Sequence, residues 1–159
     1  MNVDSIGGSK YLLTLTDDYT KYVTVYFIRS KSEVLSKFME YVSRVENETG
    51  LRVRAISTDD GGGYTSQSFN KFYADKGIVH QFTNPYTPEQ NGVSERLNHT
   101  LIESQRSMLY HAKMPLRFWA ESMSTAVNLH NRSPISALKD KTLFESWFGK
   151  KSNVSNFFL

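Results

Sequence analysis

The stretch VRAISTDDGGG, residues 53–63, decides the class of fold. Residues 53–57 are apolar and β-branched enough to predict a short strand. The two aspartates and three glycines that follow predict a turn at the carboxyl end of that strand. Open α/β sheets bind ligands at the carboxyl ends of their strands. Asp59 is therefore expected where such a sheet places a site.

On both sides of this stretch, strand and helix patterns alternate. Strands are predicted over residues 11–17, 22–28 and 79–82, the first two joined as a hairpin. Helical spacing of apolar residues predicts helices over 34–49, 69–76, 93–109, 116–131 and 144–148, with an extended loop up to Gly92 before the longest. The pattern contains no repeat or linker and predicts a single mixed α/β layer structure.

Composition bounds the function without deciding it. The 159 residues are 39% hydrophobic, enough for one domain with a sizeable core. The absence of cysteine excludes disulfides and thiolate zinc sites and favours an intracellular setting. No apolar run approaches the roughly 20 residues of a membrane span, so no membrane partner is expected. The net charge of +3 permits a nucleic-acid partner but does not require one.

The sharpest candidate site is a pair of carboxylates, Asp59 and Glu95. Glu95 is expected in the first turn of the long helix, opposite its apolar stripe, so that both acids can meet at one sheet edge. Two such oxygen ligands without Cys or His favour Mg²⁺ or Mn²⁺ over zinc. Each acid alone has a plainer explanation, because Asp is common in glycine turns and Glu complements the dipole at a helix start.

The spacing and the surrounding motifs favour the site. Thirty-five residues, 60–94, separate the two acids, and the intervening text includes NPYTPEQNGVSERLN, residues 84–98. Further segments follow in order: GGSKY at 7–11, DDYTKY at 17–22, RSML at 106–109, FWAE at 118–121 and NRSP at 131–134. Together they resemble the catalytic core of the integrase in copia-type retrotransposon Pol polyproteins, over nearly the whole chain.

This resemblance implies a ribonuclease-H-like fold, a mixed five-stranded sheet with helices on both faces. It implies two magnesium ions among three acids, with Asp59 as the second acid and Glu95 as the third. It also implies DNA integration by 3'-end processing and strand transfer, with DNA and further integrase copies as partners and the nucleus as the place of action. The positions that match DNA-contacting ones are Tyr86, Asn91, Arg96, Asn98 and His99.

The chain also departs from the family pattern. Residues 1–159 are expected to be an integrase core truncated at its amino terminus, with 135–159 as its carboxyl-terminal tail, so that the first catalytic Asp and most of the central first strand are missing. Asp60 and Gly63 stand where Asn and Glu are usual. An alternative is therefore a non-catalytic, decayed transposon remnant that binds DNA or an intact integrase.

Four lysines near the carboxyl end, at 139, 141, 150 and 151, could touch DNA phosphate, although solvated lysines are the default.

Overall fold

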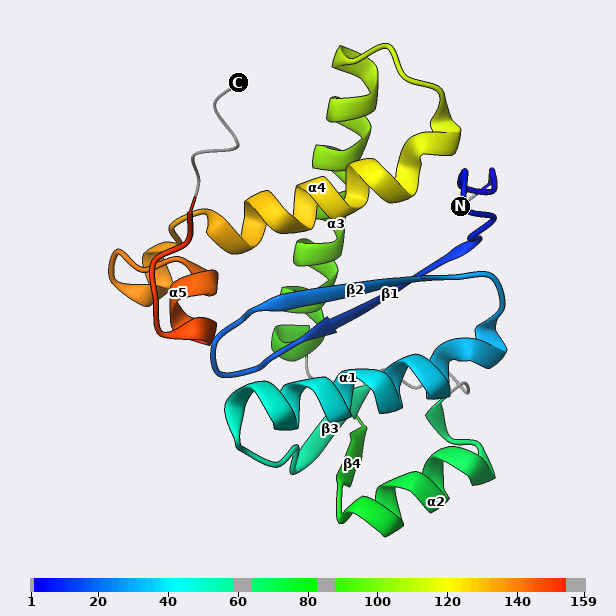
Figure 1. The fold of residues 1–159 in the computed structure, drawn as a ribbon, viewed down its shortest axis with the longest axis vertical. Coiled ribbons are helices and arrows are strands. Elements are labelled where there is room, and N and C mark those ends of the chain that lie inside the picture. Colours follow the sequence, from blue (N-terminus) through cyan, green and yellow to red (C-terminus); the bar gives the residue numbers. More distant parts are fainter. Residues whose placement is uncertain (1, 59–63, 83–87, 154–159) are drawn as a thin grey trace. The chain divides into compact units, whose positions relative to one another are not determined.

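The computed structural model describes residues 2–58, 64–82 and 88–153. Its backbone clusters into two compact units, one formed by residues 1–27 and 100–159 and the other by residues 28–99. Figure 1 shows the order of the elements along the chain. Each unit is described by itself below.

The first unit opens with a hairpin of β1 (Tyr11–Thr16) and β2 (Val23–Ile28), whose last residue, Ile28, belongs to the second unit. Its turn is built by Asp17, whose Oδ2 accepts hydrogen bonds of 2.7 Å from both the amide and the hydroxyl of Thr20. Lys21, at φ 61°, adopts the left-handed conformation that closes the turn. The predicted hairpin is confirmed, and the DDYTKY segment is explained as turn chemistry.

Helix α4 (Trp119–Arg132), which follows the short η3 turn (Leu116–Phe118), carries the core of this unit. Trp119 and Ala120 pack with Leu109, and the Trp119 ring meets Phe27 edge to face. The indole of Trp119 also donates a hydrogen bond of 3.0 Å to the carbonyl of Val3. Trp119 is therefore a core residue that fastens the amino-terminal segment.

Asn131, near the end of α4, bonds to the backbone of β2. Its Oδ1 accepts from the Val23 amide at 3.0 Å, and its Nδ2 donates to the Val23 carbonyl at 2.8 Å. Both residues are buried, with 3% and 1% of their surfaces exposed. The side-chain amide thus pairs with the strand as a neighbouring strand's backbone would.

The last elements of this unit are η4 (Ser136–Leu138) and α5 (Leu143–Phe148). A capping box between Thr142 and Glu145 starts α5, and Gly149, at φ 67°, ends it. The Trp147 ring stacks on Tyr22 with centroids 5.3 Å apart. The small terminal helix predicted from the sequence is confirmed.

The second unit contains two helices that pack through an aromatic cluster. Ser30 caps a short η1 turn (Lys31–Glu33) that leads into α1 (Val34–Thr49). Phe38 of α1 lies within about 6 Å, ring to ring, of three rings of α2 (Gln67–Lys76), namely Phe69, Phe72 and Tyr73. The helix ends predicted at Gly50 and Gly77 are confirmed, because both glycines adopt the left-handed conformation, at φ 68° and 69°.

The unit's two strands, β3 (Ala55–Thr58) and β4 (Val79–Phe82), are parallel, with Ala55 opposite Val79 and Thr58 opposite Phe82. The strand predicted over residues 53–57 is therefore observed over residues 55–58, beginning two residues later. Within the described residues the strands form two two-stranded sheets, β1 with β2 and β3 with β4.

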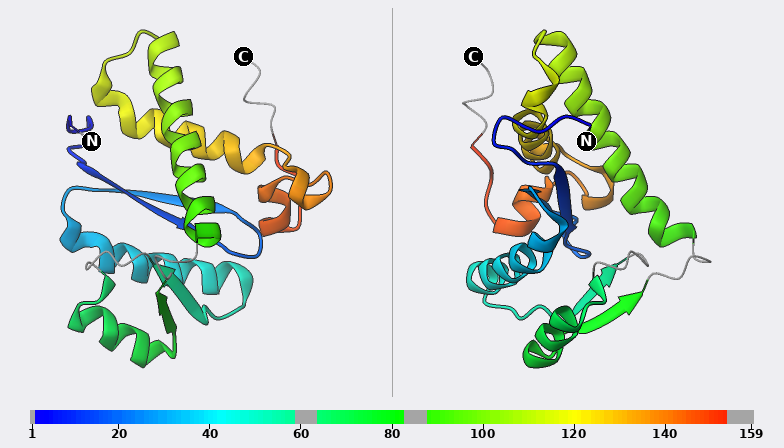
Figure 2. Two further views of the ribbon diagram at one scale, coloured as in Figure 1. Left: turned by 180° about the vertical axis from the view of Figure 1, so that it is seen from behind. Right: turned by 90° about the vertical axis from the view of Figure 1, so that its right-hand side faces the viewer.

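Helix α3 (Pro88–His111) is one continuous helix in both views of Figure 2. The prediction of an extended loop through Gly92 is wrong, because the helix already begins at Pro88. Proline suits a first helical position, where its missing N–H has no partner to lose. Leu101 and Leu109 of the predicted apolar stripe are buried, whereas Val93 is 51% exposed.

Among the helices within the described ranges, none has the length and apolar character needed to cross a bilayer.

Candidate functional site

The carboxyl edge of β3 and β4 is held by a polar contact between the strands. The Thr58 hydroxyl and Nε2 of His80 lie 2.8 Å apart, within hydrogen-bonding distance. Thr58 is buried and His80 half-buried. Asp59 is the next residue after Thr58, so this contact holds the strand end to which the first candidate acid is joined.

The His80 ring also packs against two aromatic rings. Its centroid lies 5.0 Å from that of Tyr73 and 4.3 Å from that of Phe82. Burial, with a smaller contribution from Tyr64, raises the pKa of Tyr73 to about 12. No short-range sequence signal links His80 to Thr58, which lies 22 positions away.

Glu95, the second candidate acid, lies on an exposed face of α3. Its predicted exposure is confirmed, but its predicted place in the first helical turn is wrong, because α3 begins at Pro88. Asn98 and His99, three and four positions further, share this face and are exposed too. The structure therefore brings together one acid and two polar side chains.

Arg96 lies beside that face, and its guanidinium folds back over Gly92. A methyl group added at Gly92 would come within 3.1 Å of Nη1 of Arg96. Gly92 thus leaves room for the arginine to lie along the helix. Asn91, expected in the loop before the helix, is instead part of α3.

Asp59 and Tyr86, the remaining predicted site residues, lie outside the described residues. Within the described ranges, no group of three His, Asp or Glu side chains could hold a metal ion. The candidate donors fit magnesium in kind, because Asp59 and Glu95 are carboxylates, the ligands that hard divalent cations prefer. The prediction that these two acids share a metal stays a prediction.

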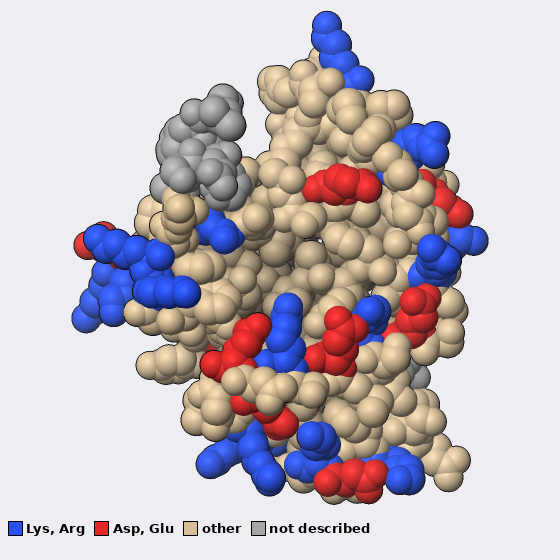
Figure 3. Space-filling view, in the orientation of Figure 1, with Lys and Arg blue, Asp and Glu red and all other residues tan. Residues whose placement is uncertain are grey.

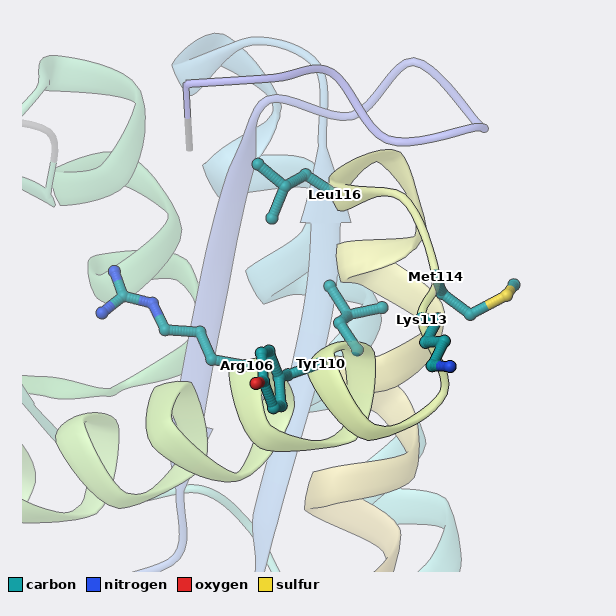
Figure 4. Close-up of a pocket in the computed structure, with 6 residues that line it drawn as sticks. Arg106, Tyr110, Lys113, Met114 and Leu116 are labelled. Carbon is teal, nitrogen blue, oxygen red and sulfur yellow. The ribbon is translucent and has the colours of Figure 1, made fainter.

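A cavity in the first unit contains none of the predicted site residues. It measures about 530 Å³ and is lined by Arg106, Leu109, Tyr110, Lys113, Met114 and Leu116. In Figure 4 Arg106 extends to one side, and Lys113 and Met114 lie at the other end of the group. Its lining is mainly apolar and has no carboxylate, so it offers no metal chemistry.

Solved structures of integrases share the fold of this chain. Integrase catalytic cores of HTLV-2, solved in complex with magnesium in a trimeric and a dimeric form, give TM-scores of 0.64 and 0.63 at 21% and 22% identity. They cover 84% and 86% of this chain, and 82% and 83% of their own. An intasome of simian T-cell lymphotropic virus in complex with PP2A regulatory subunit B56 gamma gives 0.68 at 22% identity, covering 86% of this chain and 47% of that one. The fold is that of integrase catalytic cores, which are ribonuclease-H-like.

The sequence comparisons identify the family. The integrase core domain family matches residues 1–88, so the chain belongs to that family. The chain is 40% identical over 156 residues to the retrovirus-related Pol polyprotein from transposon TNT 1-94 of Nicotiana tabacum. It is 33% and 31% identical to those from transposons RE2 and RE1 of Arabidopsis thaliana. These matches cover 98%, 94% and 91% of this chain but only 12%, 10% and 10% of the polyproteins.

Proposed function

We propose that the chain is the catalytic-core part of a retrotransposon integrase and acts in DNA integration by 3'-end processing and strand transfer. DNA integration is the general function of the family to which the chain belongs. The observation that supports the proposal is the position of the two acids relative to the described elements. Asp59 directly follows the last residue of a parallel strand, and Glu95 lies on an exposed helical face.

In this proposal Asp59 and Glu95 hold divalent metal through their carboxylate oxygens. Magnesium ions bound there would supply Lewis-acid chemistry to the attacking and leaving oxygens of a displacement at phosphorus. The contact between Thr58 and His80 ties the carboxyl end of β3, the strand that Asp59 follows in the sequence, to β4. The DNA end lies along the α3 face that carries Glu95.

The polar residues around Glu95 bind that DNA. Asn98 and His99 share the exposed face of the acid, and the Arg96 guanidinium lies beside it as a cation for phosphate. Tyr86 and Asn91 complete the set by resemblance to the family. Action on host DNA places the protein in the nucleus, and the oligomers formed by the HTLV-2 cores suggest that it works with further integrase copies.

A polypeptide of residues 1–159 alone is proposed to be inactive. By resemblance to the family, residues 1–159 supply two acids of a three-acid site, Asp59 and Glu95, and the metal would be held fully only when a third acid joins them. The alternative, a non-catalytic remnant that binds DNA or an intact integrase, is favoured by Gly63, which stands where the family usually has Glu.

The test is a strand-transfer assay with a blunt oligonucleotide and either Mg²⁺ or Mn²⁺. We expect no joining by residues 1–159, and joining when a strand bearing the family's first Asp precedes them. Glu95→Gln should abolish the recovered activity, whereas Glu103→Gln, at an exposed acid further along α3, should leave it unchanged. Joining by residues 1–159 that survives Glu95→Gln would refute the proposed roles.

A further inference from the structure

Some lysines of the described residues form ion pairs, whereas others do not. Within the described residues, five lysines outside the carboxyl-terminal region lie 2.7 to 4.0 Å from a carboxylate: Lys10, Lys21, Lys37, Lys71 and Lys76. The four lysines that flank α5, Lys139, Lys141, Lys150 and Lys151, form no such pair within those residues and are all exposed. We name these four the α5 lysine patch.

The patch is a segment with an excess of positive charge, four lysines against two acids. Figure 3 shows Lys and Arg side chains gathered over the part of the surface that α5 and its flanking loops occupy in Figure 1. Two acids belong to the same segment, Asp140 and Glu145. Glu145 is engaged in the helix cap, where its Oε2 accepts from the Thr142 amide at 3.0 Å. Positive charges gathered in this way repel one another, and an anionic partner relieves that repulsion.

The backbone that presents the patch is strained and fixed. Lys139 and Asp140 are consecutive non-glycine residues with positive φ, 45° and 68°, a conformation that costs free energy and occurs most often at functional positions. An antiparallel bridge between Pro134 and Thr142 closes this loop. The Trp147 ring, stacked on Tyr22, anchors α5 itself. The lysines therefore project from a frame that is held before any ligand binds.

The patch lies at both ends of α5. Two lysines precede the six-residue helix and two follow it. Lysine ammonium groups bind phosphates as point charges and read no base sequence.

We propose that the α5 lysine patch is a second DNA-binding surface, which contacts the phosphate backbone of duplex DNA independently of sequence. The inference rests on the proposed function, because a protein that joins DNA ends must hold duplex DNA. It adds a surface on residues 139–151, which are separate from Glu95 and its neighbours on α3. The partner is the backbone of duplex DNA, not a lipid surface.

The experiment compares two variants that carry the same change in net charge. In the patch variant, Lys139, Lys141, Lys150 and Lys151 become Gln; in the matched control, Lys10, Lys37, Lys71 and Lys76 become Gln. Binding to a duplex of arbitrary sequence is measured by fluorescence anisotropy at several salt concentrations. The patch variant should lose affinity at least about tenfold at 0.1 M salt. Its slope of log K against log salt should fall by about 0.9 for each lysine that contacts a phosphate, up to about 3.6.

Protection from acetylation supplies a readout that needs no variant. With the unaltered chain, duplex DNA should shield the four patch lysines from an amine-reactive reagent, as measured by mass spectrometry, and leave Lys71 and Lys76 reactive. This measurement also tests the patch if either variant fails to fold.

The outcomes separate the two proposals. Equal losses in both variants, or protection spread evenly over all lysines, would show that only net charge matters and would overturn the patch. DNA binding that is unchanged in the patch variant would overturn it while leaving the proposed function standing. No binding of duplex DNA by the unaltered chain would count against both. Patch-dependent binding to anionic phospholipid vesicles without binding to duplex would overturn the choice of partner.

Discussion

Replacing Asn131 should destabilise the chain more than replacing any exposed asparagine of α4. The Asn131 side chain makes both of its hydrogen bonds to one residue, Val23, and both residues are buried. In Asn131→Ala, the Val23 amide and carbonyl lose their partners in a place that water does not reach. In Asn131→Asp, the amide of Val23 keeps an acceptor but the carbonyl loses its donor.

The magnitude follows from the two bonds. An ordinary hydrogen bond contributes about 1 kcal/mol, and each buried group left unpaired costs about 1 to 3 kcal/mol. Asn131→Ala should therefore lower the free energy of unfolding by about 2 to 5 kcal/mol. This is a large part of the roughly 5 to 15 kcal/mol of a typical domain. It corresponds to a fall in Tm of about 2 to 4 °C for each kcal/mol.

The assay is urea or thermal unfolding followed by circular dichroism, with Asn128→Ala as the matched control. Asn128 lies on the same helix and is exposed, so its replacement should change stability by less than about 0.5 kcal/mol. Equal effects of the two substitutions would refute the reasoning, because they would show that the buried amide contributes nothing beyond helix propensity.

Two further predictions concern the second unit. Stability should fall as pH rises from about 10 to about 12, because the folded-state pKa of Tyr73 is raised to about 12 and the folded chain holds the phenol proton longer than the unfolded chain does. Tyr73→Phe should make Tm depend less on pH when thermal unfolding is measured between pH 9 and pH 12. An unchanged pH dependence would show that Tyr73 is not the cause of the decline. Thr58→Val and His80→Leu should each lower the free energy of unfolding by about 1 kcal/mol. The double variant should lose less stability than the sum of the two single variants, because both substitutions remove the same contact. Strictly additive losses would show that the contact contributes nothing.

Local signals in the sequence predicted the elements well. Glycines 50 and 77 end helices because each adopts the left-handed conformation that closes a helix. The same kind of reasoning failed at Pro88, where a proline was taken to hold an extended loop although it also suits a helix start. The error moved Glu95 out of the first helical turn and moved Asn91 into the helix.

Contacts between distant residues could not be predicted in this way. Asn131 bonds to Val23 across 108 positions, and neither residue carries a local pattern that reveals the other. The NRSP segment supported the family resemblance, but only the structure explains its asparagine as the partner of a strand backbone. The α5 lysine patch was visible as four lysines, whereas its lack of carboxylate partners and its strained loop emerged from the coordinates.

The central claim is that Asp59 and Glu95 belong to one metal site that a further acid completes. The most direct measurement is calorimetric titration with Mn²⁺ of residues 1–159, alone and preceded by a strand with the family's Asp-x-x-Gly-Pro lead. The added strand should recover metal binding, and Asp59→Asn and Glu95→Gln should each weaken it, with non-additive effects because the charges share one site. The claim would be contradicted if Gly63→Glu alone raised the affinity for Mn²⁺ as much as the added strand does. It would also be contradicted if neither acid substitution changed that affinity.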